Sequence, residues 1–246
     1  MPFDFPDRLL DALRNAEGVT VLTGAGISAE SGVPTFRDAL TGLWARYRPE
    51  DLATPEAFQH NPKLVWEWYE WRRELVRQAA PNPAHLALVE MERHVRHFIL
   101  ATQNVDGLHR KAGSRNVVEL HGNLFRNKCF DHSHSLDSLP ESAEKPPHCP
   151  QCGSLVRPDV VWFGEALPSA ALEQAWLAAQ DCDLFFLIGT SSLVYPAAGL
   201  PHLALEKGIP VVELNPQSTP FTQRAGYVLT GLAGEILPAL IRTAWS

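Results

Sequence analysis

The chain has 246 residues, 45% of them hydrophobic, and its 21 Lys and Arg against 28 Asp and Glu give a formal net charge of -7. This length can bury the core of one large α/β unit. The acidic balance, without a Lys/Arg-dense run, argues against nucleic acid or an anionic membrane as the main partner and is compatible with a cationic substrate segment. No stretch approaches the roughly eighteen apolar residues of a membrane span, and residues 1–7 lack a signal pattern, so we expect a cytoplasmic protein.

Residues 19–23 predict a short strand, which runs into the G-x-G-x-x-A turn of residues 24–29. Glycines in such a turn allow a tight bend and a close approach of backbone to a pyrophosphate, which the first N–H groups of the next helix can bind. A dehydrogenase also needs an acidic residue at the end of its second strand, but residues 33–60 read as loop and short helix. Glu50 and Asp51 are therefore poor ribose ligands, and we expect a nucleotide bound in another way.

Residues 64–78 predict a helix with one apolar arc at about 100° per residue. The apolar arc holds Leu64, Val65, Trp68, Tyr69, Trp71, Leu75 and Val76, and the opposite arc holds Glu67, Glu70, Arg73, Glu74 and Arg77. Arg72 lies inside the apolar arc, where a guanidinium is costly unless an anion or several acceptors satisfy it. The planar guanidinium of Arg72, beside the Tyr69 hydroxyl, suits a carboxylate ligand. The alternative is a structural ion pair between Arg72 and an acid of the sheet domain.

Polar side chains follow two further predicted strands. Gln103, Asn104 and Asp106 come directly after the apolar run of residues 97–101, and His121 follows residues 118–120. Because ligands of open α/β sheets bind outside the carboxyl ends of the strands, we expect these groups to share one crevice. Solvated turns are the alternative.

Three cysteines bracket a loop rich in Ser, Pro and Glu. Cys129 and His132 form a C-x2-H pair, and sixteen residues later Cys149 and Cys152 form a C-x2-C pair. Zinc accepts three thiolates and one imidazole, so the spacing predicts a structural zinc site. Other candidates for the place of His132 are His134, His148 and Asp131. A ribbon that folds without metal is the alternative, and a disulfide does not suit a reducing compartment.

Residues 183–188 and 209–215 are continuous apolar runs, typical of strands covered on both faces. The first ends in Gly189-Thr190-Ser191 and the second in Asn215. Together with the first glycine turn, three strand ends then converge on one ligand.

Several long motifs, in this order, closely resemble the sirtuins over roughly residues 17–240. They are residues 24–37, 102–109, 120–122, 161–165, 189–191 and 215–216. The resemblance implies an α/β fold, a Rossmann-like parallel sheet domain with a smaller inserted domain made of a helical module and a zinc-ribbon-like module. One catalytic unit would span 1–246. The large domain would cover about 1–32, 79–124 and 158–246, and the small domain about 33–78 and 125–157.

The resemblance implies removal of acyl groups from lysine with consumption of NAD. In that chemistry the acyl oxygen attacks the ribose carbon that bears nicotinamide, and a histidine base activates a ribose hydroxyl. His121 matches the base, and an imidazole with a pKa near 6.5 suits the transfer. Asn104 and Asp106 match residues that hold the nicotinamide side and orient the ribose or a water.

The remaining cofactor contacts follow by position. Gln103 matches a ribose contact, Phe36 a shield over the reactive carbon, and Arg37 a phosphate contact. Backbone N–H groups near the phosphates belong to Gly24, Ala25 and Gly26. The adenosine side matches Gly189, Thr190, Ser191, Asn215 and Ala233. Three further residues could either contact the ligand or make structural hydrogen bonds: Ser31, Thr35 and His109.

The substrate side also follows from the resemblance. The segment that pairs with substrate backbone by strand addition is Val161, Trp162, Phe163, Gly164 and Glu165. Tyr69 and Arg72 resemble the pair of the branch that removes succinyl, malonyl and glutaryl groups, and Ala57 matches a small residue that leaves room for the longer chain. We therefore expect a monomer that acts on acylated lysine of proteins or peptides, prefers these acidic groups with some deacetylation, and releases nicotinamide and 2′-O-acyl-ADP-ribose.

Other functions fit parts of the pattern. A deacetylase or a protein ADP-ribosyltransferase of the same fold would also begin by breaking the nicotinamide bond. A non-catalytic NAD sensor has no need of a base beside the ribose, and a dehydrogenase is disfavoured by the missing strand-end acid.

Overall fold

The structure is a computed structural model and describes residues 3–34, 47–136, 138–139 and 144–245. Its centre is a parallel sheet with the strand order β3-β2-β1-β7-β8-β9. The strands are β1 (Gly18–Thr23), β2 (His97–Thr102), β3 (Val117–Glu119), β7 (Leu184–Ile188), β8 (Val211–Asn215) and β9 (Tyr227–Thr230). The strands predicted at 19–23, 97–101, 183–188 and 209–215 are confirmed to within two residues.

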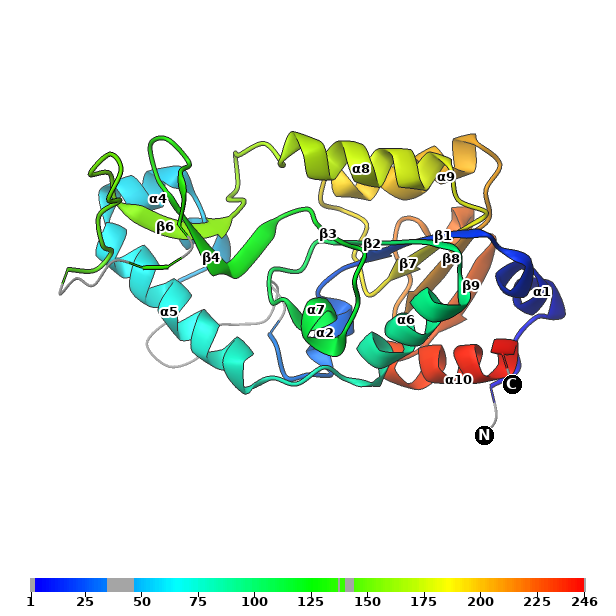
Figure 1. Cartoon of the computed structure of the whole chain (residues 1–246). Coiled ribbons are helices and arrows are strands. Elements are labelled where there is room, and N and C mark those ends of the chain that lie inside the picture. The colour runs from blue at the N-terminus through cyan, green and yellow to red at the C-terminus, as the bar shows by residue number, and fades with distance from the viewer. Residues whose placement is uncertain (1–2, 35–46, 137, 140–143, 246) are drawn as a thin grey trace.

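Helices cover both faces of this sheet (Figure 1). One face packs against α1 (Asp7–Asn15), α6 (Pro83–His94) and α10 (Ala233–Trp245), and the other packs against α8 (Ser169–Gln180) and α9 (Leu200–Glu206). Every residue of β1 and β7 is buried. This double cover explains the continuous apolar runs, because neither face of these strands meets water.

The strand order reverses at β1, which pairs with β2 on one side and with β7 on the other. At such a switch point the loops leaving the strands diverge and open a crevice at their carboxyl ends. The short helices α2 (Gly26–Ala29) and α7 (Leu108–Ala112) lie at this edge. The fold therefore places the glycine turn and the 102–109 loop at the position where doubly wound sheets bind ligands.

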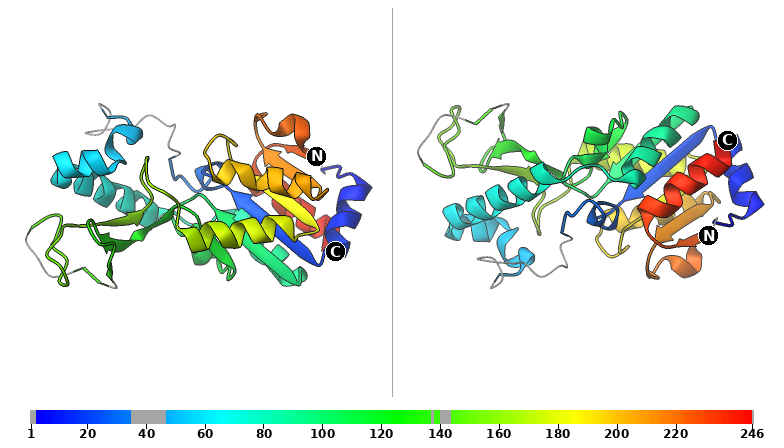
Figure 2. Two further views of the ribbon diagram at one scale, coloured as in Figure 1. Left: turned by 90° about the horizontal axis from the view of Figure 1, so that it is seen from above. Right: turned by 90° about the horizontal axis from the view of Figure 1, so that it is seen from below.

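A second, antiparallel sheet of order β5-β4-β6 lies at the end of the molecule away from the termini (Figures 1 and 2). Its strands are β4 (Gly122–Cys129), β5 (Ser135–Leu136) and β6 (Val156–Val160). It packs against α3 (Pro49–Leu52), α4 (Pro55–His60) and α5 (Pro62–Gln78) around an aromatic core. The predicted domain division stays a prediction, and β4 and β6 each cross one of its boundaries.

The helix predicted at 64–78 is confirmed as α5 and begins two residues earlier. Asn61 caps it by accepting a hydrogen bond from the Leu64 amide (3.1 Å), and Pro62 occupies the first turn, where its missing N–H costs nothing. The polar arc was predicted wrongly at Arg73, which is only 3% exposed. Its Nε donates to the Leu124 carbonyl (2.6 Å) and its Nη2 to Asn127 (2.6 Å), so β4 supplies acceptors that the helix pattern does not reveal.

None of the helices within the described ranges is long and apolar enough to cross a membrane.

Candidate active site

The first glycine turn lies directly against the loop that leaves β7. Gly26 N donates to the Gly189 carbonyl (2.8 Å), and a Cβ on Gly24 or Gly26 would come within 2.8 Å of Gly189 O. Gly189 has a φ of +59°, and a Cβ there would meet Ile27 N at 2.5 Å. Backbone therefore packs on backbone, which only glycine permits at these three positions. The half-buried Ala25 precedes α2 in this turn.

Asn104 is buried against the same turn. Its Nδ2 donates to the Gly24 carbonyl and to Ser28 Oγ, both at 3.1 Å, and its amide N donates to Thr102 Oγ1 (3.1 Å). These bonds hold the carboxamide at the switch point. The side chain is thus fixed between the glycine turn and the end of β2.

Asp106 is also buried, with Oδ1 accepting from the Leu108 amide (2.8 Å) at the start of α7. Burial raises the pKa of this carboxyl, against the opposing effects of the Leu108 amide, the Ser28 hydroxyl and the Arg72 guanidinium. Asp106 and Asn104 therefore share Ser28 as a neighbour. The structure brings both predicted residues together.

The strand ends of β2, β7 and β8 are joined by side-chain hydrogen bonds. Gln103 Nε2 donates to Thr190 Oγ1 (3.0 Å), and Asn215 Nδ2 donates to the Thr190 carbonyl (2.7 Å). Gly231 N donates to the Asn215 carbonyl (3.2 Å), just before the buried Ala233 begins α10. The ends of β1, β7 and β8 converge as the sequence predicted, because Gly26 N donates to the Gly189 carbonyl and Gly189 N to the Leu214 carbonyl, and the end of β2 joins them through Gln103. Ser191 lies half-buried beside Thr190.

His121 lies half-buried between β3 and β4. Its Nδ1 is 3.0 Å from the Gln103 carbonyl, which can only accept, so Nδ1 carries the proton and Nε2 has a free lone pair. Burial lowers the pKa of His121, and the hydrogen bond to Gln103 partly opposes this effect. The imidazole is therefore neutral near pH 7 and able to accept a proton through Nε2.

Two serines near the glycine loops retain hydrogen-bonding capacity for a ligand. Within the described residues, the buried hydroxyls of Ser31 and Ser192 have no hydrogen-bond partner. Ser192 also has a φ of +56°, a strained value for a residue other than glycine. Buried polar atoms normally find partners, so this edge of the sheet fits a polar ligand such as a dinucleotide. Phe36, Arg37 and Thr35 lie outside the described residues.

The segment 161–165 leaves β6 close to His121. Val161 N donates to the His121 carbonyl (2.9 Å), and Phe163 N donates to the Ala53 carbonyl (2.9 Å). Phe163 and Gly164 are exposed, whereas Trp162 is buried among the aromatic residues of the second core. One tip of the segment thus faces outward while its base is anchored.

Tyr69 and Arg72 lie together on α5. Tyr69 is 0% exposed, and its hydroxyl accepts a hydrogen bond from Trp162 Nε1 (2.8 Å). The Arg72 guanidinium lies over the Trp68 ring, 5.1 Å from its centroid, and 5.8 Å from that of Tyr69. Burial lowers the pKa of Arg72, while Tyr69 and Asp106 act in the opposite direction. Ala57 packs half-buried against the same core.

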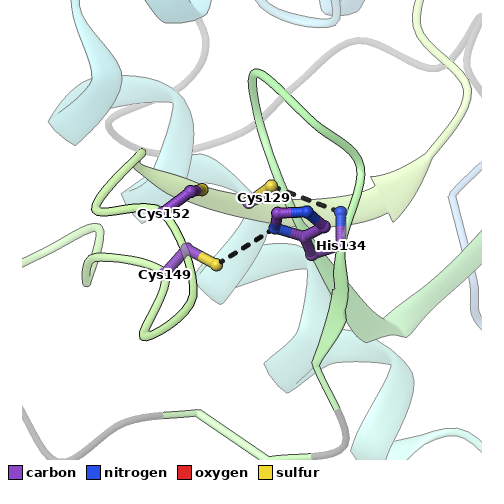
Figure 3. A group of neighbouring side chains, drawn as sticks. All are labelled: Cys129, His134, Cys149 and Cys152. Carbon is purple, nitrogen blue, oxygen red and sulfur yellow. Dashed lines mark hydrogen bonds between the residues drawn. The ribbon is translucent and has the colours of Figure 1, made fainter.

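The cysteine group is formed by Cys129, His134, Cys149 and Cys152, with ligand atoms all within 4.8 Å of one another (Figure 3). His134 replaces the predicted His132. Its amide N donates to Cys129 Sγ (3.2 Å), and its Nδ1 lies 3.8 Å from Cys149 Sγ.

The turn between β4 and β5 explains the correction. Cys129 N donates to the His134 carbonyl (3.0 Å), which brings His134 back beside the thiol, whereas His132 stands exposed at the tip and only its ring stacks on His134. Three sulfurs and one imidazole are a donor set that zinc accepts.

The sequence patterns missed some residues of this site. Thr23 Oγ1 bonds Thr102 Oγ1 (2.8 Å) and His109 Nε2 (2.9 Å), which gives His109 a structural hydrogen bond beneath the crevice. Ser28 lay within the quoted motif of residues 24–37 but had no assigned contact, and Ser192 directly follows the motif of residues 189–191. Their serine type next to a glycine turn was the available signal.

This chain is similar to a family model and to curated proteins over most of its length. The Sir2 family model matches residues 24–196. The NAD-dependent protein deacylase 1 of Pseudomonas aeruginosa is 51% identical over 245 residues, covering 96% of this chain and 98% of the relative. An NAD-dependent protein deacylase of Pyrococcus furiosus is 53% identical over 226 residues, covering 89% and 90%.

Solved structures of Sir2 proteins superpose closely on this chain. A Sir2 homologue in complex with NAD superposes with a TM-score of 0.91 at 46% identity, covering 98% of this chain and 94% of that chain. A Sir2 complex with a p53 peptide and NAD+ superposes with a TM-score of 0.85 at 32% identity, covering 96% and 97%.

Proposed function

The chain belongs to the Sir2 family and is an NAD-dependent protein deacylase, and we propose that it prefers negatively charged acyl groups on lysine. These groups are succinyl, malonyl and glutaryl, with some deacetylation. The observation that supports the preference is the guanidinium of Arg72, held among aromatic rings beside the Tyr69 hydroxyl.

A cation in this position favours a carboxylate ligand. Burial of a guanidinium costs free energy, and a bidentate carboxylate offsets this cost better than the neutral methyl group of an acetyl chain does. Trp162 occupies one acceptor site of the Tyr69 oxygen, so the phenol O–H can donate to an acid at the end of the acyl chain. Ala57 packs against the same core, and its small side chain would leave more space for a longer acyl chain than a larger residue would.

The same guanidinium also interacts with the carboxylate of Asp106. Asp106 is the acid of the sheet domain that the structural alternative requires. An acyl carboxylate and Asp106 would both favour the charged form of Arg72. The preference for succinyl over acetyl peptides therefore distinguishes an Arg72 that binds the acyl group from one that only pairs with Asp106.

The reaction needs a base, an oriented cofactor and a positioned lysine. When bound, NAD supplies the ribose carbon that receives the acyl oxygen as nicotinamide leaves. His121 Nε2 would take the proton of a ribose hydroxyl, because Nδ1 is engaged by Gln103. Asn104 and Asp106 would hold the nicotinamide side, and Gln103, Thr190 and Asn215 would bind the rest of the nucleotide.

The products would be nicotinamide, deacylated lysine and 2′-O-acyl-ADP-ribose. The net charge of -7 supports binding of lysine-rich segments of proteins or peptides. Cys129, His134, Cys149 and Cys152 would hold a structural zinc ion, which has no open position for chemistry.

Mass spectrometry of matched acetyl-lysine and succinyl-lysine peptides tests the proposal. With the wild-type protein and NAD we expect faster loss of the succinyl group, and with His121→Ala we expect neither loss. Faster loss of acetyl would contradict the acidic preference. Transfer of ADP-ribose to the peptide would instead indicate a transferase, and NAD binding without turnover a sensor.

A further inference from the structure

Arg157 is a buried arginine of the second sheet, and its side chain contacts the 161–165 segment. It lies on β6 and is only 2% exposed. Its Nη1 donates to Glu165 Oε1 (2.5 Å), and its Nη2 donates to Glu165 Oε2 (2.9 Å) and to the Val160 carbonyl (2.7 Å). The guanidinium carbon also lies 3.2 Å from the centroid of the Trp162 ring. Arg157 is thus fixed by a bidentate carboxylate and by an aromatic face.

Glu165 closes a tight turn at the end of the segment. Its amide N donates to the Trp162 carbonyl (3.0 Å), and its Oε2 accepts from the Trp162 amide N (2.8 Å). Gly164 has a φ of +86°, which matches the third position of a type II turn. Burial alone would raise the pKa of Glu165, but the hydrogen bonds to Arg157 and Trp162 hold it below its usual value. The carboxylate is therefore charged and shared between the arginine and the turn.

The turn presents an exposed tip. Phe163, 49% exposed, and Gly164 form this tip, while Trp162 points inward to Tyr69. The base of the segment is tied to the His121 main chain through Val161. Any tilt of the turn would therefore move its tip relative to both the His121 base and the Tyr69 hydroxyl.

A buried ion pair contributes little net free energy to the stability of a fold. Desolvating two charges consumes much of their attraction, and an apolar pair of similar volume often serves stability equally well. Within the described part of the chain, Arg157 Nε is also buried without a hydrogen-bond partner. What the pair supplies beyond an apolar contact is a rigid, planar geometry.

We propose that Arg157 and Glu165 are positioning residues for the acylated peptide, whose ion pair fixes the 162–165 turn in register with His121 and Tyr69. Their effect falls on peptide binding, because the hydrogen bonds of both side chains go to each other and to the main chain of residues 160 and 162. The inference rests on the proposed pairing of residues 161–165 with substrate backbone. It does not depend on the acidic acyl preference.

Steady-state kinetics with matched acetyl and succinyl peptides tests this role. Arg157→Met keeps volume and removes the fork, and Glu165→Gln keeps an acceptor for the Trp162 amide while removing the charge. For both variants we expect the peptide KM to rise about tenfold, by a similar factor for both peptides, because a turn that the ion pair no longer holds must be ordered when the peptide binds. The KM for NAD and kcat at saturating peptide should stay near the wild-type values.

Arg73→Met is the matched control. Arg73 is similarly buried, but its side-chain hydrogen bonds within the described part of the chain go to β4 and Glu70 rather than to the turn. We expect it to lower the melting temperature without raising the peptide KM. Binding of a fluorescent acyl-peptide, measured by anisotropy on NAD-competent protein, gives a readout that needs no turnover.

Two results would overturn the proposal. One is an unchanged peptide KM and affinity in folded Glu165→Gln, and the other is an equal rise of peptide KM in Arg73→Met. If the wild type instead processes both peptides equally, the acidic preference fails, yet the change in acetyl-peptide KM still reports on Arg157 and Glu165.

Discussion

The indole N–H of Trp162 donates to the hydroxyl oxygen of Tyr69 over 2.8 Å. One residue belongs to the segment proposed to bind peptide and the other to the proposed acyl pocket. If both proposals hold, the bond would tie the position of the lysine backbone to the position of the group at the end of its acyl chain. It also orients the phenol, because the indole occupies one of the two acceptor sites on the oxygen.

Tyr69→Phe should lower succinyl-peptide kcat/KM by about tenfold, which corresponds to about 1.4 kcal/mol and to one hydrogen bond with a charged group. The acetyl peptide, which has no terminal carboxylate, should lose much less. Parallel kinetics on the two peptides checks this. An equal loss for both would assign Tyr69 to holding Trp162 alone.

The acid limb of the pH profile should report His121. A base must be neutral in the free enzyme, and burial lowers the pKa of His121 below 6.5. The imidazole therefore stays neutral to lower pH than a solvated histidine does, and the acid limb of kcat/KM for the acyl peptide should be centred below pH 6.5. A limb centred above pH 6.5 would contradict this assignment.

Zinc binding should distinguish two histidines that are two residues apart. We expect His134→Ala to lose zinc, as measured by metal analysis after dialysis, and to unfold at a lower temperature. His132→Ala, at the exposed tip of the same turn, should retain the metal. Zinc retained by the first variant and lost by the second would restore the ligand that the spacing predicted.

Two buried histidines should make the fold sensitive to acid. The rings of His85 and His109 lie 4.8 Å apart. Burial lowers the pKa of His85 to about 4, and burial together with His85 lowers the pKa of His109 well below its usual value. Below pH 6.5 the unfolded imidazoles bind protons that the folded ones do not, so the free energy of unfolding falls with pH.

The loss from each ring is at most about 1.4 kcal/mol per pH unit. It should run from pH 6.5 down to about 4 for His85. Urea titrations of His85→Gln should show a flatter slope over this range, and His60→Gln, at an exposed position, should match the wild type. A slope unchanged by His85→Gln would remove this source of acid sensitivity.

Periodicity and strand-end polarity predicted most of the parallel sheet and the convergence of Gln103, Asn104 and His121. Both signals are local, since a buried strand needs a continuous apolar run and its carboxyl end needs polar groups for a ligand. The glycine turn was predicted for its approach to a phosphate. The structure adds that Gly24 and Gly26 also meet Gly189 from a distant strand.

The errors arose where distant strands supply the partner. Arg73 was placed on the solvent side of α5, because helical periodicity does not reveal that β4 offers the Leu124 carbonyl. His132 was chosen by the two-residue spacing of zinc knuckles, whereas the path of the turn into β5 returns His134 to the thiols. The Trp162–Tyr69 bond joins residues 93 positions apart in sequence and left no local signal.

The most direct test of the acidic acyl preference is the ratio of kcat/KM for succinyl over acetyl peptides, compared between the wild type and Arg72→Met. Loss of one partner of a buried charge pair costs about 2–5 kcal/mol, so succinyl-peptide kcat/KM should fall by more than about tenfold while acetyl-peptide kcat/KM changes little. If Arg72→Met leaves desuccinylation intact or lowers both activities equally, the guanidinium serves Asp106 and not the acyl group, and the proposed preference is wrong.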